Sequence, residues 1–123
     1  MLEEALTTAL ASVADGRRYW VRAPQGTARP YVVLYRISGV PQYTFSARSL
    51  TTSRIQANCI ADTYEAAKQL ARDLIAALDG YSDRANGLHA VFIDSDGRDL
   101  PAESSGGVDY LYGVAVDLIA HHT

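Results

Sequence analysis

The stretch "NCIADTYEAAKQL", residues 58–70, changes its hydrophobic period in the middle. Up to Ala61, apolar and polar residues alternate as they do in a strand: Ile55, Ala57, Cys59 and Ala61 share one face, and Arg54, Gln56 and Asn58 share the other. From Tyr64 onwards the apolar residues recur at helical spacing. The switch predicts a strand over residues 53–61 that runs directly into a helix, and this constrains the fold more than any other feature.

The junction between strand and helix carries the residues that a helix start needs. Asp62 is predicted to be the N-cap, with Glu65 completing a capping box, and Gly80 suits the C′ position after a helix that ends near Asp79. The buried stripe of this helix is predicted to consist of alanines and leucines: Ala66, Ala67, Leu70, Ala71, Leu74, Ala77 and Leu78. We therefore interpret the junction as part of the scaffold and not as an active site.

The rest of the chain divides into segments of recognisable pattern. The sequence predicts a helix over residues 2–13, a short extended piece over 17–22, and strands over 31–38, 88–94 and 108–122. Residues 39–51 and 95–107 are predicted to be long polar connections, because they are rich in Gly, Pro and hydroxyl residues or in charge. Gly113 inside the last strand suggests a bulge or a bend.

This order, α-β-β-α-β-β, indicates an α+β fold. We predict a four-stranded, mostly antiparallel sheet with two helices packed on one face. A chain of 123 residues is long enough for one core, so residues 1–123 are expected to form a single domain. Such a sheet leaves one face and two edges uncovered, and neighbouring subunits are one way to cover them.

Composition and the single cysteine restrict the possible classes. No apolar run approaches the ~20 residues of a membrane span, and Glu3 and Glu4 stand where a signal peptide would carry basic residues. We expect a protein made and kept in the cytosol. Cys59 is the only cysteine, which excludes an internal disulfide, and its place on the apolar face predicts a buried core residue.

The candidate catalytic and metal-binding motifs in the sequence are each incomplete. In "FIDSDGRDLPAE" an EF-hand alignment puts Phe92 at the first ligand position, where it cannot ligate calcium. His121 and His122 point to opposite faces of a strand and would not share a metal. There is no nucleophile elbow and no Gly-rich phosphate loop. We expect no catalytic residue, no metal and no cofactor.

Charge is distributed unevenly along the chain. Residues 1–54 hold seven arginines against three acidic residues, whereas residues 55–123 hold four basic and eleven acidic residues. Such asymmetry is typical of complementary faces in an assembly, although scattered surface charge explains it equally well. The candidate interface or lumen residues are arginines, acids and aromatics beside the two long connections: Arg48, Arg54, Tyr43, Phe45, Asp96 and Arg98.

Three segments together resemble the tail terminator, or tail completion, proteins of long-tailed phages and of phage-derived gene transfer particles, also described as head–tail joining proteins. They are "APQGTARPYVVLYRISG", "RIQANCIADTYEAAKQLARDLIAALDG" and "GVDYLYGVAVDLIAHH", preceded by the helix "LEEALTTALAS". The similarity runs along most of the chain and rests on the order and spacing of these segments. The two long connections vary widely in such proteins, so no contact residues are carried over from the family there.

The resemblance implies a structural virion protein and no enzyme. Similar proteins form a ring of six on the head-proximal end of the tail tube, stop tube growth, and offer a docking face to the head-completion, or stopper, protein. The implied partners are other copies of the chain, the tail tube protein, the stopper protein and double-stranded DNA that passes through the ring without sequence recognition; no membrane is implied. The implied location is the tail or neck of the virion, with synthesis in the bacterial cytoplasm.

Two alternatives remain open from the sequence. One is a neighbouring neck role, such as head completion. The other is a small ligand-binding domain or enzyme on the second face of the sheet, lined by Tyr110, Tyr112 and His89.

Overall fold

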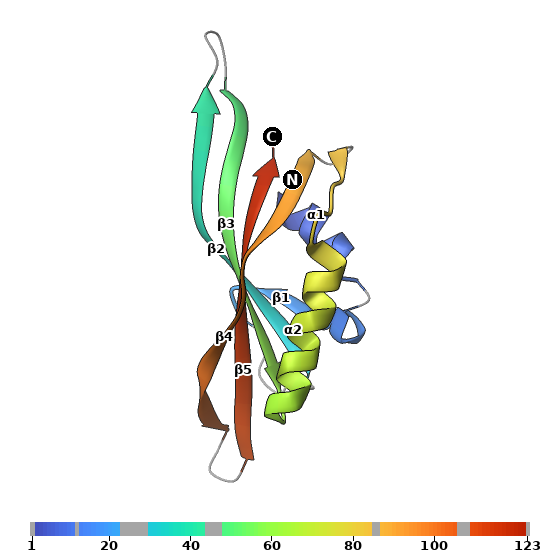
Figure 1. Ribbon diagram of the computed structural model, residues 1–123, viewed down its shortest axis with the longest axis vertical. Coiled ribbons are helices and arrows are strands. Elements are labelled where there is room, and N and C mark those ends of the chain that lie inside the picture. Colours follow the sequence, from blue (N-terminus) through green and yellow to red (C-terminus); the bar gives the residue numbers. More distant parts are fainter. Residues whose placement is uncertain are drawn as a thin grey trace.

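A mixed five-stranded sheet with helices on one face forms the molecule (Figure 1). The structure is a computed structural model that describes residues 2–11, 13–22, 30–43, 48–84, 87–105 and 109–122. Its elements, in chain order, are α1 (Leu2–Ala9), the 3₁₀ helix η1 (Val13–Gly16), β1 (Arg18–Trp20), β2 (Tyr31–Tyr43), β3 (Arg48–Ala61), α2 (Tyr64–Leu78), β4 (Leu88–Ser105) and β5 (Asp109–His122). The α+β class and the placement of both helices on one face are confirmed.

The sheet has one strand more than the four we predicted. Its order is β1-β2-β3-β5-β4, and β1 lies parallel to β2 at one edge while all other pairs are antiparallel. The short segment over residues 17–22 supplies this strand. It is held from the helix side, because Trp20 Nε1 donates to Thr7 Oγ1 at 2.9 Å and Arg18 Nε donates to the Thr7 carbonyl. β1 depends on contacts with residues distant in the chain, in β2 and α1. The sequence of residues 17–22 alone therefore did not reveal its pairing with β2.

The prediction that residues 39–51 and 95–107 are loops is wrong in large part. β2 and β3 remain paired from Gly39–Ser53 out to Tyr43–Arg48, and β4 remains paired with β5 out to Ser105–Asp109. The two hairpins extend beyond the body of the sheet in opposite directions (Figure 1). Backbone pairing holds these segments, and Val40, Arg98 and Asp99 within them are exposed, so the segments lack the alternation of apolar residues on which the prediction depended.

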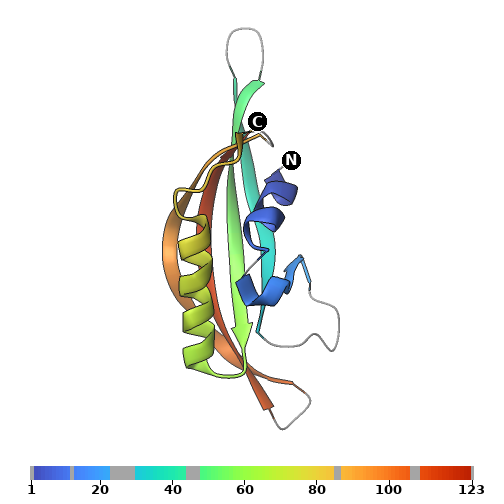
Figure 2. The ribbon, with the colours of Figure 1, turned by 90° about the vertical axis from the view of Figure 1, so that its right-hand side faces the viewer.

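The core lies between the helices and the sheet. α1 and α2 run side by side over the same face (Figure 2), and their leucines pack with the alternate residues of β3 and β5. The predicted inward residues of β3 are all buried: Ile55, Ala57, Cys59 and Ala61. The predicted stripe of α2 is buried at Ala67, Leu70, Ala71, Leu74 and Leu78, whereas Ala66 is exposed because it lies in the first turn, away from the sheet.

The helix ends differ from the prediction in two places. The N-cap of α2 is Thr63 and not Asp62: Thr63 Oγ1 accepts a hydrogen bond from the Ala66 backbone N–H at 3.1 Å. The predicted capping box with Glu65 is therefore out of register by one residue. The N-terminal helix ends at Ala9, and the chain then turns through the separate η1, which ends at Gly16. Gly80 follows the C-cap with a φ of +73°, as predicted for C′.

Gly113 is not itself a bulged residue, but the β4 register shifts directly beyond its rung, between Leu100 and Glu103. It pairs in regular register with Ile60 on β3 and with Leu100 on β4. A Cβ at this position would stand 2.9 Å from Leu100 Cδ1 and 3.0 Å from Ile60 Cδ1, closer than ordinary carbon contacts. The residue is a glycine because two large side chains close over it.

Candidate interface

The face of the sheet opposite the helices carries a second set of side chains, and we call it the helix-free face. Because Ala57 and Cys59 are buried beneath the helices, Gln56 and Asn58 point to the helix-free face. Gln56 Nε2 donates to Asn58 Oδ1 at 2.8 Å, and both side chains are half-buried. The middle of this face is therefore polar and already partly hydrogen-bonded within the chain.

Two of the predicted interface residues, Arg54 and Arg98, form ion pairs on this face. Arg54 on β3 contacts the Asp94 carboxylate on β4, and Arg98 on β4 contacts Asp117 Oδ2 on β5 at 3.0 Å. Both arginine side chains are about half exposed. An exposed pair such as Arg54–Asp94 is worth only about 0–1 kcal/mol, whereas the Asp117 carboxylate is 16% exposed and depends more on Arg98.

The other predicted interface residues are only partly described. Tyr43 and Arg48 are paired with each other in the backbone register at the outer end of the β2–β3 hairpin. Asp96 lies within β4, and like those two its side chain is outside the described part of the structure. Phe45 lies outside the described residues altogether. Because residues 92–103 are extended in β4, the region does not form a calcium-binding loop of the EF-hand type.

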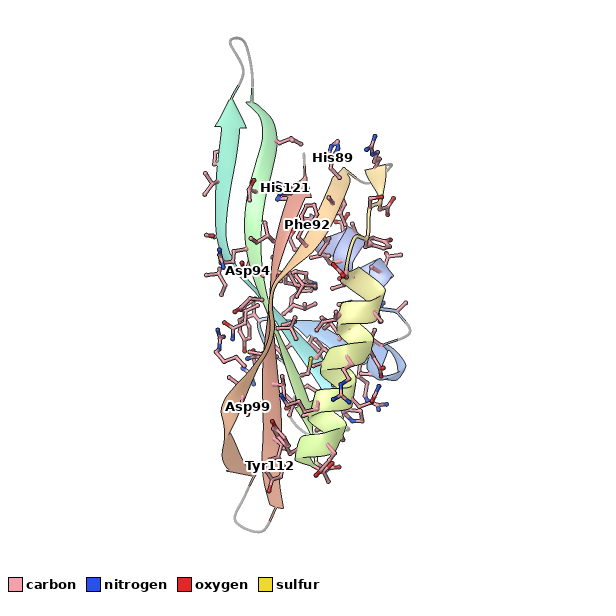
Figure 3. All side chains as sticks on the ribbon, in the orientation of Figure 1. His89, Phe92, Asp94, Asp99, Tyr112 and His121 are labelled. Carbon is pink, nitrogen blue, oxygen red and sulfur yellow. The ribbon has the colours of Figure 1, made fainter. Side chains whose placement is uncertain are left out.

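A cluster on the helix-free face was not predicted from the sequence. Phe92 is exposed, and its ring meets His121 edge-on with 5.7 Å between centroids (Figure 3). His121 Nδ1 lies 3.1 Å from Thr52 Oγ1. Phe92 stands in an unbroken apolar run, where the sequence alone does not say which residue faces outward. The opposite orientations of His121 and His122 are confirmed, because His122 is buried on the helix side beside Ser53.

A charged cluster ties the middle of β4 to α2 on the helix side. Tyr64 donates from its hydroxyl to the Asp99 carboxylate at 3.1 Å, and Lys68 Nζ lies 3.4 Å from Asp99 Oδ1. The hydrogen bond with Tyr64 raises the pKa of Lys68, and the negative charge of Asp99 raises it further. All three groups are accessible, so the cluster contributes little to stability, but Lys68 and Asp99 balance each other's charge.

The thiol of Cys59 is buried and is not activated as a nucleophile. Cys59 is fully buried in the core cluster, and burial raises the pKa of its thiol to about 12. A thiol needs a lowered pKa and access to act as a nucleophile. The prediction of a core cysteine is confirmed.

The alternative site on the second face of the sheet is not assembled as expected. Tyr112 is on the helix side, where it packs against the core cluster, and not on the helix-free face. His89 lies at the start of β4, at the opposite end of the sheet from Tyr112 (Figure 3), and the side chain of Tyr110 is outside the described set. Tyr112 and His89 therefore do not line one pocket.

The described residues also bear on metal binding and on membrane crossing. Over residues 2–122, with the gaps given above, no three His, Cys, Asp or Glu side chains come together in a way that could hold a metal ion. Among the helices of this same part, none has both the length and the apolar character that crossing a membrane requires.

Comparison with solved structures shows the same fold in proteins of low sequence identity. A chain from the virion of a native gene transfer agent particle superimposes with a TM-score of 0.62 at 18% identity, over 95% of this chain and 83% of that one. A second solved structure has a TM-score of 0.53 at 17% identity, over 97% of this chain and 92% of its own. No curated protein matches the sequence.

The match to a protein-family model extends over most of the chain. The model of the tail completion protein gp17 family matches residues 4–106, a span that runs from α1 through β4 and so includes both sheet edges and both ion-paired arginines of the helix-free face. The chain therefore belongs to the tail completion protein gp17 family.

Proposed function

We propose that this protein is a structural component of a phage-type tail. It forms a ring, of six copies, on the head-proximal end of the tail tube. The ring terminates tube growth, joins the tail to the head-completion or stopper protein, and lets DNA pass through its centre. It is made in the bacterial cytoplasm and ends in the neck of the particle. The observation that carries the proposal is the family match over residues 4–106.

The shape of the chain is compatible with a connector between two different neighbours. The β2–β3 hairpin and the β4–β5 hairpin leave the sheet at opposite ends (Figure 1). Beyond Thr51, which pairs with His122 of β5, the described residues of β2 and β3 pair only with each other. A two-stranded hairpin is only marginally stable alone in water, so these outer segments gain most from contacts with a neighbour. In our proposal one hairpin meets the tube and the other the stopper.

The charges of the helix-free face are compatible with a surface that does not bind DNA tightly. Arg54 and Arg98 are each balanced by a carboxylate, from Asp94 and Asp117. Phosphate contacts by unbalanced Arg or Lys add up without regard to sequence and would slow DNA in a conduit. Paired arginines reduce that attraction, which supports passage without sequence recognition.

Particles made without this protein test the proposal. The expected result is tails of aberrant length, or finished tails that do not join heads, as seen in electron micrographs. Complementation with the wild-type chain is the control, and it should restore joined particles. Normal joined particles in the absence of the protein would defeat the proposal.

A map of the assembled neck tests the finer statements. It is expected to show six copies around a central channel, between the last ring of the tube and the stopper. A different number of copies would correct only the stoichiometry. A position on the stopper's head side would favour the alternative neck role of head completion.

A further inference from the structure

The fold separates the basic and acidic parts of the chain onto opposite edges of the sheet. The described residues 17–22 and 30–43, which include β1 and β2, hold four arginines and no Asp or Glu. Residues 88–105, which form β4, hold four acidic residues and one arginine. The strand order β1-β2-β3-β5-β4 places β1 and β2 at one edge and β4 at the other. One edge is therefore built from strands rich in arginine, and the other from a strand rich in acidic residues.

Exposed apolar side chains lie on the same two edges. Ile37 and Val40 on β2 are 54% and 59% exposed, and Phe92 on β4 is 51% exposed. Arg36 precedes Ile37 in the chain and leaves the edge on the helix side, opposite Ile55 and beside Glu3, whereas Asp94 lies with Phe92 on the helix-free face, where it pairs with Arg54. Each edge thus has an apolar centre with charge beside it, basic on β2 and acidic on β4. This is the composition of an interface, with an apolar core and a charged rim.

The two apolar patches lie at nearly the same level along the strands. Two rungs of paired residues cross the sheet there, Val40–Thr52–His121–Ala90 and Ser38–Arg54–Ile119–Phe92. Neighbouring rungs on one face are separated by about 7 Å along the strand. When two different patches meet from copy to copy, the copies close into a flat ring if both patches lie at the same height along the ring axis. If the heights differ, each copy is displaced along the axis and the assembly is an open helix.

The edges are poorly suited to joining by continued strand pairing. β2 has a register irregularity between Arg36 and Ser38, and it carries Pro41, which has no N–H to donate. β4 has four register irregularities along its length. Bulges and prolines are the features by which sheet edges resist edge-to-edge pairing. Contact between these edges therefore runs through side chains.

We propose that a second copy of this chain docks its β4 edge, at Phe92 and Asp94, against the β2 edge of the first, at Arg36, Ile37 and Val40. The contact repeats from copy to copy, with the strands running along the ring axis. It rests on the ring proposed above. Arg36 lies 3.5 Å from Glu3, and Asp94 pairs with Arg54, all on exposed side chains. The Arg36–Glu3 pair is weak enough to exchange, and the two oxygens of the Asp94 carboxylate allow it to keep Arg54 and also accept from Arg36 of the next copy.

A pair of introduced cysteines tests the contact in assembled particles. Within one copy, Val40 and Phe92 are separated by three strand spacings, about 14 Å. A disulfide needs Cα atoms closer than about 7 Å, so a bond within the copy cannot form. Particles carrying Val40→Cys/Phe92→Cys are expected to give, on mild oxidation with diamide, a ladder of covalent multimers up to the full ring. Ile37→Cys/Phe92→Cys serves as a second pair with slightly different geometry.

Three controls separate the possible outcomes. Each single cysteine variant is expected to stay monomeric, since unlike patches meet; dimers from Val40→Cys alone would mean a two-fold contact and overturn the proposal. Val21→Cys/Phe92→Cys is the matched control, because Val21 is 66% exposed but stands at the level of Leu34, about 20 Å along the edge from Val40. It is expected to give no ladder.

Charged substitutions give an independent readout. Val40→Asp and Phe92→Asp are each expected to remove the protein from particles, because an unpaired charge would be buried between copies, whereas Val21→Asp is expected to be incorporated normally. Rings seen in micrographs that contain Val40→Asp and Phe92→Asp protein, and that form no ladder with either cysteine pair, would overturn this contact and leave the ring intact. Wild-type particles without any such ring would instead overturn the proposed function.

Discussion

Ser53 Oγ lies 2.7 Å from His122 Nε2, and both side chains are buried where β3 pairs with β5. We predict that Ser53→Ala destabilises the folded chain by about 1–3 kcal/mol, because a buried ring nitrogen loses a short hydrogen bond that water cannot replace. Urea denaturation of the purified protein measures the change in the free energy of unfolding.

The neighbouring residue provides the matched control. Thr52 is next to Ser53 on the same strand and lies 3.1 Å from His121 Nδ1, but on the helix-free face, where both are partly exposed. Thr52→Ala is expected to cost less than Ser53→Ala, since water can reach the histidine. Equal losses from the two substitutions would show that burial of the Ser53–His122 pair does not set its strength.

Thr63 is predicted to be worth about 1 kcal/mol to α2 as its N-cap. Thr63→Ala removes the oxygen that accepts from the Ala66 N–H, and thermal unfolding should show the loss. Thr63→Ser keeps the oxygen and should be close to wild type. Asp62→Ala should cost less than Thr63→Ala, because Asp62 contributes its charge near the helix start and not the cap. A larger loss of stability from Asp62→Ala than from Thr63→Ala would instead support Asp62 as the N-cap, as the sequence suggested.

The elements with a buried face were predictable from the sequence, and those without one were not. β3 over residues 53–61 and α2 follow periods of 2 and 3.6, because one face of each packs in the core. Residues 39–43 and 48–51 are held by partners on the other strand of a hairpin, and their sequence has no apolar period to detect. β4 carries four register irregularities that shift its alternation each time.

The candidate interface shows the same division. Arg54 could be singled out from its position between a long connection and a regular strand. Its partner Asp94 is 40 residues away, and the partner of Arg98 is 19 residues away, so neither pair follows from local spacing. The uneven charge was visible along the chain, but its placement on two edges depends on the strand order, in which β5 lies between β3 and β4.

Gly113→Ala is predicted to destabilise the sheet by about 1–3 kcal/mol through overpacking. The added Cβ would lie 2.9 Å from Leu100 Cδ1 and 3.0 Å from Ile60 Cδ1. Leu100→Ala removes the nearest of these contacts, so the double variant should lose less stability than the sum of the two single variants. Gly97→Ala is the control, since its Cβ would meet only Val114 Cγ1 at 3.5 Å. Strict additivity at Gly113 and Leu100 would contradict the packing argument.

Cys59 is predicted to react with thiol reagents only when the chain unfolds. With its pKa raised from the ordinary 9.0 to about 12, the buried thiol is ionised about three orders of magnitude less than a free one at pH 8. Labelling with a disulfide reagent should therefore be very slow in buffer and rapid in denaturing urea. Val40→Cys in a Cys59→Ala background should label rapidly in buffer, because residue 40 is exposed. Fast labelling of the folded wild-type chain would mean that the core opens readily around β3.

The same burial predicts how stability depends on alkaline pH. The folded-state pKa lies above the unfolded value, so the unfolded chain releases the thiol proton first as the pH rises. The contribution of Cys59 is therefore constant below pH 9 and falls between pH 9 and about 12, by about 1.4 kcal/mol for each pH unit. Tyrosine and lysine titrations overlap this window, so the test is the difference between wild type and Cys59→Ala in parallel denaturation series. The wild type should lose stability more steeply than the variant above pH 9; parallel curves would show that the thiol ionises without opening the core.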